Sequence, residues 1–220
     1  EYNIHGFIIT PNKFPIMQGA SMAISNERGD KERPMYTTKD LSHLSKEISK
    51  LLKLSDNVGL QLFHNGVGFG ASIPRHEHWL LMDFGIAYDK LGESYGFDEA
   101  DKESFKKSKS VSYMPHFPFS HAIFSPEEPD RIVSFLQKIH TDLSKRFECG
   151  HVPHTISQGQ DGILITIAKE YREKGRGAGI AAGHLILKTK EEFERADFQY
   201  CLNSLKQLFP REELNLERYL

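Results

Sequence analysis

Residues 65–85 read NGVGFGASIPRHEHWLLMDFG, and this stretch decides the fold that we expect. Three glycines among its first six residues predict a loop, because glycine weakens the interior of a strand. The apolar run that follows predicts a strand, along which side chains alternate between two faces. His76, His78 and Leu80 then share one face, and Trp79 lies on the other. Two imidazoles beside a glycine loop indicate a site where a ligand approaches the backbone.

The residues of this loop favour a phosphate site. Backbone N–H groups of glycines can surround phosphate oxygens, since no Cβ blocks the approach. The side chains of Asn65 and Ser72 can donate further hydrogen bonds. His78 could attack the phosphorus as a nucleophile and form a phosphoramidate, which requires a neutral imidazole. His76 would then donate a hydrogen bond to the phosphate.

The composition excludes several classes of function. The 220 residues carry a formal net charge of −2, so no basic field predicts binding to nucleic acid. The two cysteines, Cys149 and Cys201, form no disulfide framework and favour a reducing compartment. No apolar run approaches the roughly 20 residues of a membrane span, and no signal peptide is visible. We therefore expect a cytoplasmic protein that binds neither nucleic acid nor membranes.

Hydrophobic periodicity predicts strands and a helix in the first half of the chain. The expected elements are strands at 3–10 and 21–27, a helix at 37–55, and strands at 58–66 and 75–87. Thr37 or Thr38 would cap the helix. The helix has one apolar stripe at helical spacing, formed by Leu41, Leu44, Ile48, Leu51 and Leu52. This stripe predicts a face that packs against a sheet.

The second half predicts a similar order of elements. They are a strand at 120–124, a helix after residue 125, strands at 154–159 and 162–170, a glycine-rich loop and strand at 175–189, and a last helix. Ser125 and Glu128 have capping-box spacing, with Pro126 as first helical residue. Thr189 and Glu192 repeat that spacing before the last helix. The apolar residues of the two helices are Ile132, Leu136, Ile139 and Leu143 in the first, and Phe193, Tyr200 and Leu208 in the last.

The two halves align with each other. SMAISNE (21–27) matches SHAIFSP (120–126), and GASIPRHEHWLL (70–81) matches GAGIAAGHLILK (177–188). Such a match indicates a degenerate internal duplication. We therefore expect an α+β fold, in which two pseudo-symmetric halves share an antiparallel sheet with flanking helices.

The expected boundaries follow from composition. The first half spans 1–87 and the second spans 113–220, and together they would form one compact unit. Residues 88–112 are charged and lack periodicity, which is typical of a solvated linker. Exposed sheet edges could pair two copies of the chain into a homodimer.

Two segments carry a resemblance to a known family. NKFP (12–15) and HNGVGFGASIPRHEHW (64–79) resemble the histidine triad superfamily, and in particular the branch of galactose-1-phosphate uridylyltransferase and the dinucleoside tetraphosphate phosphorylases. GILITIAKE and GAGIAAGHLILKT, in the second half, are similar to the C-terminal part of those phosphorylases. The resemblance extends over roughly residues 5–205 and implies a fold of two histidine-triad-like halves.

The resemblance also implies a function and a set of site residues. The expected enzyme is a nucleotidyltransferase or phosphorylase that acts on a nucleotide sugar or a dinucleoside polyphosphate. His78 is its nucleophile and accepts a nucleoside monophosphate, and inorganic phosphate or a sugar phosphate then takes the nucleotide. The side chains and backbone that line the phosphates are those of His76, Asn65, Gly70 and Ser72. No cofactor is required, although a divalent metal ion could take part.

Leu80 departs from the family pattern, which has glutamine or histidine at that position. A phosphate donor is therefore missing, which leaves open a nucleotide-binding module or a nucleotide hydrolase with reduced transferase activity. A third hypothesis is a metal-dependent cupin-like enzyme, in which His76 and His78 bind a metal ion and Asp83 replaces the usual carboxylate. An all-β cupin barrel fits poorly with the predicted helices.

Several other residues are weaker candidates. Lys13 could neutralise a phosphate, Gln158 could bind a substrate hydroxyl, and His184 could contact the base or sugar. Cys149, His151 and His154 are close enough in sequence to ligate zinc. Three local ligands without a Cys-x-x-Cys pair favour a polar turn instead.

Overall fold

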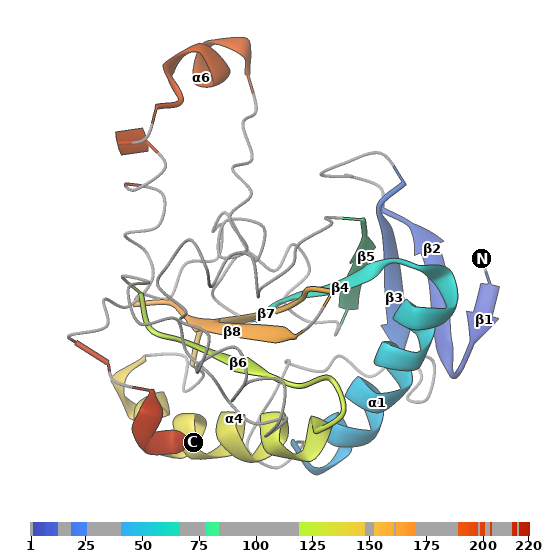
Figure 1. Cartoon of the computed structure of the whole chain (residues 1–220), viewed down its shortest axis with the longest axis horizontal. Helices are drawn as coiled ribbons and strands as arrows, with labels where there is room; N and C mark the ends of the chain where they lie inside the picture. Colours follow the sequence, from blue (N-terminus) through green and yellow to red (C-terminus); the bar gives the residue numbers. More distant parts are fainter. Residues whose placement is uncertain are drawn as a thin grey trace, which may run out of the picture.

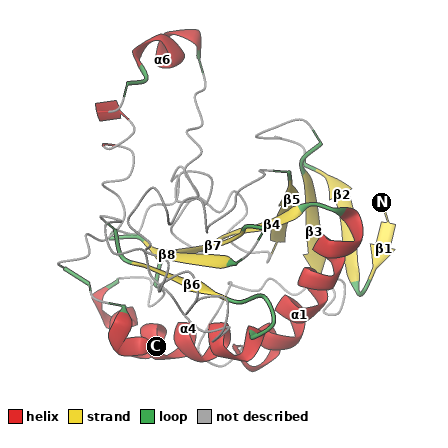
Figure 2. Cartoon of the chain, viewed as in Figure 1, coloured by secondary structure: helices red, strands yellow, loops and turns green. Residues whose placement is uncertain are grey.

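The structure is a computed structural model, and it shows one antiparallel sheet with two long helices packed against one of its faces (Figure 1). The described strands are all antiparallel and the two long helices lie on one face of the sheet, so the fold is α+β, as predicted (Figure 2). The described residues are 2–12, 19–25, 41–66, 78–83, 119–147, 152–160, 162–169, 189–197, 199–200, 203, 213–214 and 216–220.

Eight strands of the described residues form the sheet, in the order β1-β2-β3-β5-β4-β7-β8-β6. All neighbouring strands are antiparallel. The strands are β1 (Tyr2–Ile4), β2 (Phe7–Pro11), β3 (Ser21–Ser25), β4 (Gln61–Asn65), β5 (His78–Met82), β6 (His121–Phe124), β7 (His154–Gln158) and β8 (Ile163–Ile167). The sheet runs through both predicted halves of the chain, because β4 pairs with β7.

The first predicted strand is a hairpin instead. The prediction of one strand at 3–10 is wrong, because His5 and Gly6 turn the chain between β1 and β2. Both residues have positive φ, +54° and +86°. This conformation is that of a type I′ turn, which suits the right-handed twist of paired strands. Histidine tolerates this conformation better than most residues do, so the His-Gly pair is the signal that periodicity alone missed.

The sheet has an approximate two-fold axis between β4 and β7. On one side of this pair lie β5 and then β3, and on the other lie β8 and then β6. His64 pairs with Ile156 at the centre, and Ala23 and Ala122 lie at corresponding places in the outer strands. This is the correspondence that the match of 21–27 with 120–126 predicted. The strand that corresponds to β5 is β8, rather than the aligned segment 177–188, which lies outside the described residues.

Helices α1 (Leu41–Val58) and α4 (Pro129–Leu143) lie side by side on the sheet, as Figure 1 shows. Their predicted stripes are buried in the core wherever the structure describes them, including Ile48, Leu51, Leu136 and Ile139. The predicted caps Thr37 and Thr38 lie outside the described residues. Gly59, with a φ of +66°, ends α1 in the left-handed conformation that glycine favours at a helix C-terminus.

Helix α4 begins three residues later than predicted, at Pro129. The prediction of a capping box at Ser125 is wrong, since Ser125 accepts hydrogen bonds within a turn that precedes the helix. Pro129 explains the difference. A residue that precedes proline is disfavoured in helical conformation, so Glu128 is the N-cap and the helix starts at the proline.

The last predicted helix is short. Helix α6 (Lys190–Arg195) is capped by Thr189, whose Oγ1 accepts a hydrogen bond from the N–H of Glu192, as predicted. It ends at Arg195, because Asp197 caps a new turn by accepting from the N–H of Tyr200. Phe193 is 72% exposed, and Leu208 lies outside the described residues. Two short 3₁₀ helices, η1 (Ser144–Arg146) and η2 (Glu217–Tyr219), complete the described elements. None of the described helices has the length and hydropathy needed to cross a membrane.

Candidate functional site

His78 is the first residue of β5 and lies on the sheet face away from the helices. The alternation along β5 places Leu80 on the same face and puts Trp79 and Leu81 in the core beneath α1 and α4. His78 pairs with Ile24 of β3 and is 5% exposed. The predicted division of His78 and Leu80 from Trp79 is therefore confirmed by the register.

Asn65 is the last residue of β4, the strand that pairs with β5. The register of β4 and β5 ends with Phe63 paired with Leu80, and a continuation by two residues along each strand would place Asn65 opposite His78. On its other side Asn65 pairs with Thr155 of β7. Directly opposite side chains in antiparallel strands lie about 4.5–5.5 Å apart at Cβ. The structure thus places the proposed nucleophile and the proposed phosphate-binding amide on two paired strands, on the same face of the sheet.

Polar side chains continue this line across the sheet. Thr155 pairs with Thr166 of β8, and their hydroxyl oxygens are 2.8 Å apart. Thr166 pairs in turn with His121 of β6. His121 is four strands from His78, about 19 Å at the usual strand spacing, which is too far for a shared small group. We therefore define the candidate site as His78, Asn65 and Thr155.

Gln158 lies on the other face of the sheet. Its carboxamide oxygen accepts hydrogen bonds from the Ser55 hydroxyl at 2.8 Å and from the Leu62 N–H at 3.2 Å. These bonds connect α1, β4 and β7 within the core. Gln158 is thus not brought together with His78. The remaining predicted site residues, His76, Gly70, Ser72, Lys13 and His184, lie outside the described residues.

Three buried histidines form a cluster behind the candidate site, on the helix-facing side. We call His64, His154 and His140 the histidine cluster. The rings of His64 and His154 are stacked with centroids 5.9 Å apart, and His140 of α4 meets His154 edge-on at 5.5 Å. His64 also lies 4.6 Å from the ring of Trp79, which follows His78 in the chain.

Sequence reasoning missed this cluster. The strand predicted at 154–159 does begin at His154, but the interpretation of Cys149, His151 and His154 as a polar turn does not hold for His154, which is 2% exposed. The alternation of HTISQ, which groups His154 with Ile156, could have predicted a core position. His140 likewise lies four residues after Leu136 and three before Leu143, on the apolar stripe of α4.

The surroundings of His64 favour its neutral imidazole. Burial lowers the pKa of His64 well below its ordinary value, and the nearby imidazoles of His154 and His78 lower it further. A charged ring at this position would be both desolvated and repelled. The core behind Asn65 is therefore free of charge from His64 at neutral pH.

Gly66 is a glycine because His154 approaches its backbone. The Gly66 N–H donates to the His154 carbonyl oxygen at 2.8 Å. A Cβ at position 66 would lie 2.7 Å from that oxygen and 3.1 Å from two atoms of the imidazole ring. The glycine that directly follows Asn65 thus has a packing cause, apart from any contact with a ligand.

The metal hypothesis depended on a cupin barrel. The described residues form an antiparallel sheet with two long helices on one face, which is an α+β architecture and not the all-β barrel of a cupin. Within the described ranges, no group of three or more histidine, cysteine or acidic side chains is placed to hold a metal ion.

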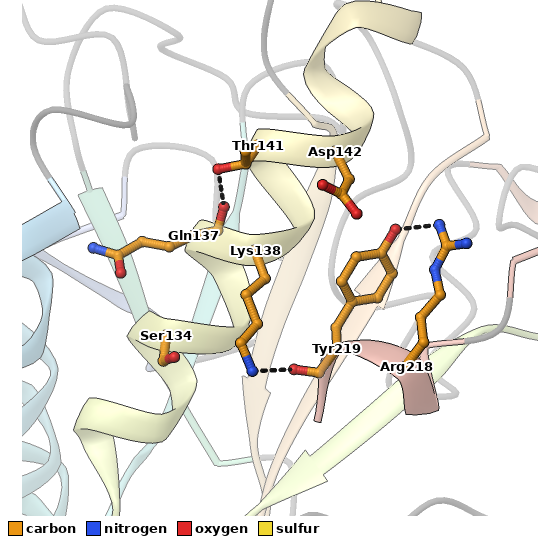
Figure 3. A pocket seen from close by; sticks show the side chains of 7 residues that line it. All are labelled: Ser134, Gln137, Lys138, Thr141, Asp142, Arg218 and Tyr219. Atoms are coloured by element: carbon orange, nitrogen blue, oxygen red, sulfur yellow. Dashed lines mark hydrogen bonds between the residues drawn. The ribbon is translucent and has the colours of Figure 1, made fainter.

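A groove of about 450 Å³ lies on the outer side of α4, against η2 (Figure 3). Lys138 donates to the carbonyl oxygen of Tyr219 at 3.2 Å, and the Arg218 guanidinium lies 4.6 Å over the Tyr219 ring. Arg218 also donates to the Tyr219 hydroxyl. These contacts fix η2 on α4, and they lie on the side of α4 that faces away from the sheet and His78.

Solved structures with the same fold include yeast Ap4A phosphorylase Apa2. Its complex with Ap4A superposes with a TM-score of 0.59 and 14% identity, over 93% of this chain and 74% of that chain. Its complex with AMP gives 0.57 and 16%, over 93% and 73%. A uridylyltransferase superposes with 0.45 and 12%, over 91% and 84%. No family model and no curated protein sequence matches the chain. The superposition with the phosphorylase confirms the fold that the sequence resemblance implied.

Substitution of Gly66 by alanine should destabilise the protein more than the same change at Gly59. At Gly66 the Cβ meets a backbone oxygen that no rotamer change can move, at a cost of about 3 kcal/mol. At Gly59 nothing lies within 4 Å, and the positive φ alone costs about 1 kcal/mol. Urea unfolding of both variants measures the difference. Equal losses would contradict the packing account of Gly66.

The stability of the protein should fall as the pH drops below about 6.5. The folded protein keeps His64 neutral, whereas the unfolded chain takes up a proton near the ordinary pKa of 6.5. The lost stability is up to about 1.4 kcal/mol per pH unit for His64. His64→Phe should flatten the pH dependence by that amount in urea unfolding at pH 5.5–7.5. His5→Asn, which removes an exposed histidine, is the control, and a slope unaffected by His64→Phe would contradict the prediction.

Proposed function

We propose that the protein is a nucleotidyltransferase or phosphorylase in which His78 forms a covalent bond with the nucleotide. The observation that supports this most is the placement of His78 and Asn65 on the paired strands β5 and β4, on the sheet face away from the helices. A second support is the fold shared with Ap4A phosphorylase Apa2. A third is the sequence NGVGFGASIPRHEH, whose glycines and histidines suit phosphate chemistry.

The proposed reaction has two displacements at the α-phosphorus. In the first, the neutral imidazole of His78 attacks, a phosphoramidate bond forms, and the bond to the leaving phosphate group breaks. In the second, an oxygen of inorganic phosphate or a sugar phosphate attacks the same phosphorus and releases His78. Asn65 donates a hydrogen bond to a phosphate oxygen in both steps, and His76, Gly70 and Ser72 complete the proposed phosphate contacts.

A dinucleoside polyphosphate is the substrate class that we favour. The structures that share the fold hold AMP and Ap4A in yeast Ap4A phosphorylase. A nucleotide sugar is the second class, and it is supported by the sequence resemblance. The proposed reaction needs no cofactor, and a divalent cation could offset the negative charge of the polyphosphate. We place the protein in the cytoplasm, on the basis of its cysteine content.

Replacement of His78 by asparagine should abolish nucleotide transfer and preserve nucleotide binding. With Ap4A labelled at the α-phosphate, the parent should acquire an acid-labile, alkali-stable label, and His78→Asn should give background counts. AMP at a hundred times its Kd should stabilise both proteins by about 2.7 kcal/mol, roughly 5–10 °C in Tm. His5→Asn should be labelled like the parent. Undiminished labelling of His78→Asn would exclude the mechanism.

A non-catalytic nucleotide-binding module is the second candidate, and Leu80 favours it. Leu80 lies on the same face as His78 but packs in a small apolar cluster with Ala20, Phe63 and Met82. The position that carries a polar side chain in the resembling family is thus apolar here. On this hypothesis the nucleotide binds beside His78 and no covalent intermediate accumulates.

Substitution of Leu80 by glutamine separates the two candidates. If only the missing donor limits transfer, the parent shows nucleotide-dependent stabilisation without label, and Leu80→Gln gains label. Leu80→Met keeps the volume without a donor and should behave like the parent. The measurements are the labelling and thermal-shift assays described for His78. A labelled parent, with no gain from Leu80→Gln, would contradict the second candidate.

A further inference from the structure

The backbone around Asn65 is held on the helix-facing side of the sheet by His154, a residue of the second half of the chain. Its two neighbours in the chain both contact His154: the ring of His64 stacks on the His154 ring at 5.9 Å, and Gly66 donates to the His154 carbonyl oxygen at 2.8 Å. The His154 ring also lies against the Gly66 backbone. Asn65 itself alternates with His64 along β4, so it lies on the opposite face of the sheet, which is also the face of His78. Contacts on both sides of one residue restrict its backbone dihedrals.

His154 is suited to this task because its ring has a fixed orientation. Nδ1 is 2.9 Å from the carbonyl oxygen of Val152, and in a neutral ring this bond selects the tautomer with hydrogen on Nδ1. The edge-on contact with His140 at 5.5 Å restricts the other end of the ring. A buried imidazole ring that is hydrogen-bonded at one edge and packed at the other cannot rotate freely.

We propose that His154 is a positioning residue that holds the backbone at Asn65, and so aims the Asn65 carboxamide at the phosphate beside His78. The effect on catalysis rests on the proposed function, whereas the contacts by which His154 holds the backbone at Asn65 do not. The second half of the chain would then complete the site of the first half, although it has Leu164 at the place that corresponds to His78. Misplacement of a polar group by about 1 Å can cost 100-fold in rate.

A merely structural role for His154 makes a different prediction. A structural residue changes stability, and its effect on the rate is the same whether or not Asn65 is present. A positioning residue acts on the rate through Asn65, so its effect on the rate disappears when Asn65 is removed. A double-mutant cycle of His154→Ala and Asn65→Ala distinguishes these cases.

The cycle is measured on the full 220-residue chain. We expect His154→Ala to slow labelling by α-labelled Ap4A about tenfold or more when Asn65 is present, and less than about twofold in Asn65→Ala. Its effect on Tm should be the same in both backgrounds. His154→Phe, which keeps a flat ring on Gly66, should recover part of the rate and replaces His154→Ala in the cycle if that variant does not fold. Equal rate losses in the two backgrounds would overturn the proposal.

His121 offers a matched control. It is also the first residue of a strand, and its Nδ1 is 2.8 Å from the carbonyl oxygen two residues before it, as in His154. It lies four strands from His78, so His121→Ala should lower Tm and leave the labelling rate of the parent unchanged. If His121→Ala slows labelling as much as His154→Ala does, the loss of any histidine bonded in this way slows the reaction. That result would overturn the proposal.

A spectroscopic measurement tests, without catalysis, whether His154 holds the backbone at Asn65. In nucleotide-free protein labelled with ¹⁵N, the side-chain amide signals of Asn65 are assigned by their loss in Asn65→Ala. We expect these signals to shift or broaden in His154→Phe and to stay in place in His121→Ala. Unchanged Asn65 signals in His154→Phe would overturn the proposal. If the Asn65 signals shift but Ap4A never labels the protein, His154 does position Asn65. The proposed nucleotide transfer is then refuted.

Discussion

The structure depends on the pairing of β4 with β7. This pair joins the two halves into one sheet, with His64 opposite Ile156 and Asn65 opposite Thr155. A shift of one residue would exchange the two faces of β7. His154 would then lie on the face away from the helices, and Thr155 would enter the apolar core between the sheet and the helices. The register therefore determines the surroundings of Asn65 and the existence of the histidine cluster together.

One face of the sheet requires uncharged side chains for the core, and the other requires polar side chains for the candidate site. Strand β4 supplies residues to both faces. Along β4, His64 points into the core, where burial lowers its pKa and favours the neutral ring. Asn65 lies on the opposite face, which it shares with His78. Neutral imidazoles can pack as aromatic plates without placing a charge behind the site. The arrangement gives the candidate site a rigid support, but it links the stability of that support to pH.

Much of the fold was predictable from local patterns. The apolar stripes of α1 and α4 follow helical spacing, and the match of SMAIS with SHAIF anticipated the two-fold relation of β3 and β6. Errors arose where one residue outweighs a pattern. Pro129 excludes its predecessor from the helix, and His5 with Gly6 turns an apparently continuous strand. In each case, the dihedral preferences of one or two residues decided the outcome.

Features that depend on neighbouring residues in the chain could be predicted from the sequence. They are the glycine loop, the histidine pair, the placement of His78 and Trp79 on opposite faces, and the α+β class. The juxtapositions were not, since they depend on contacts between residues far apart in the chain. His154 lies about ninety positions after His64, and no periodicity reports that their rings stack. Strand order and register arise from the packing of the whole sheet against its helices, so only the tertiary structure could place a histidine of the second half behind Asn65 of the first.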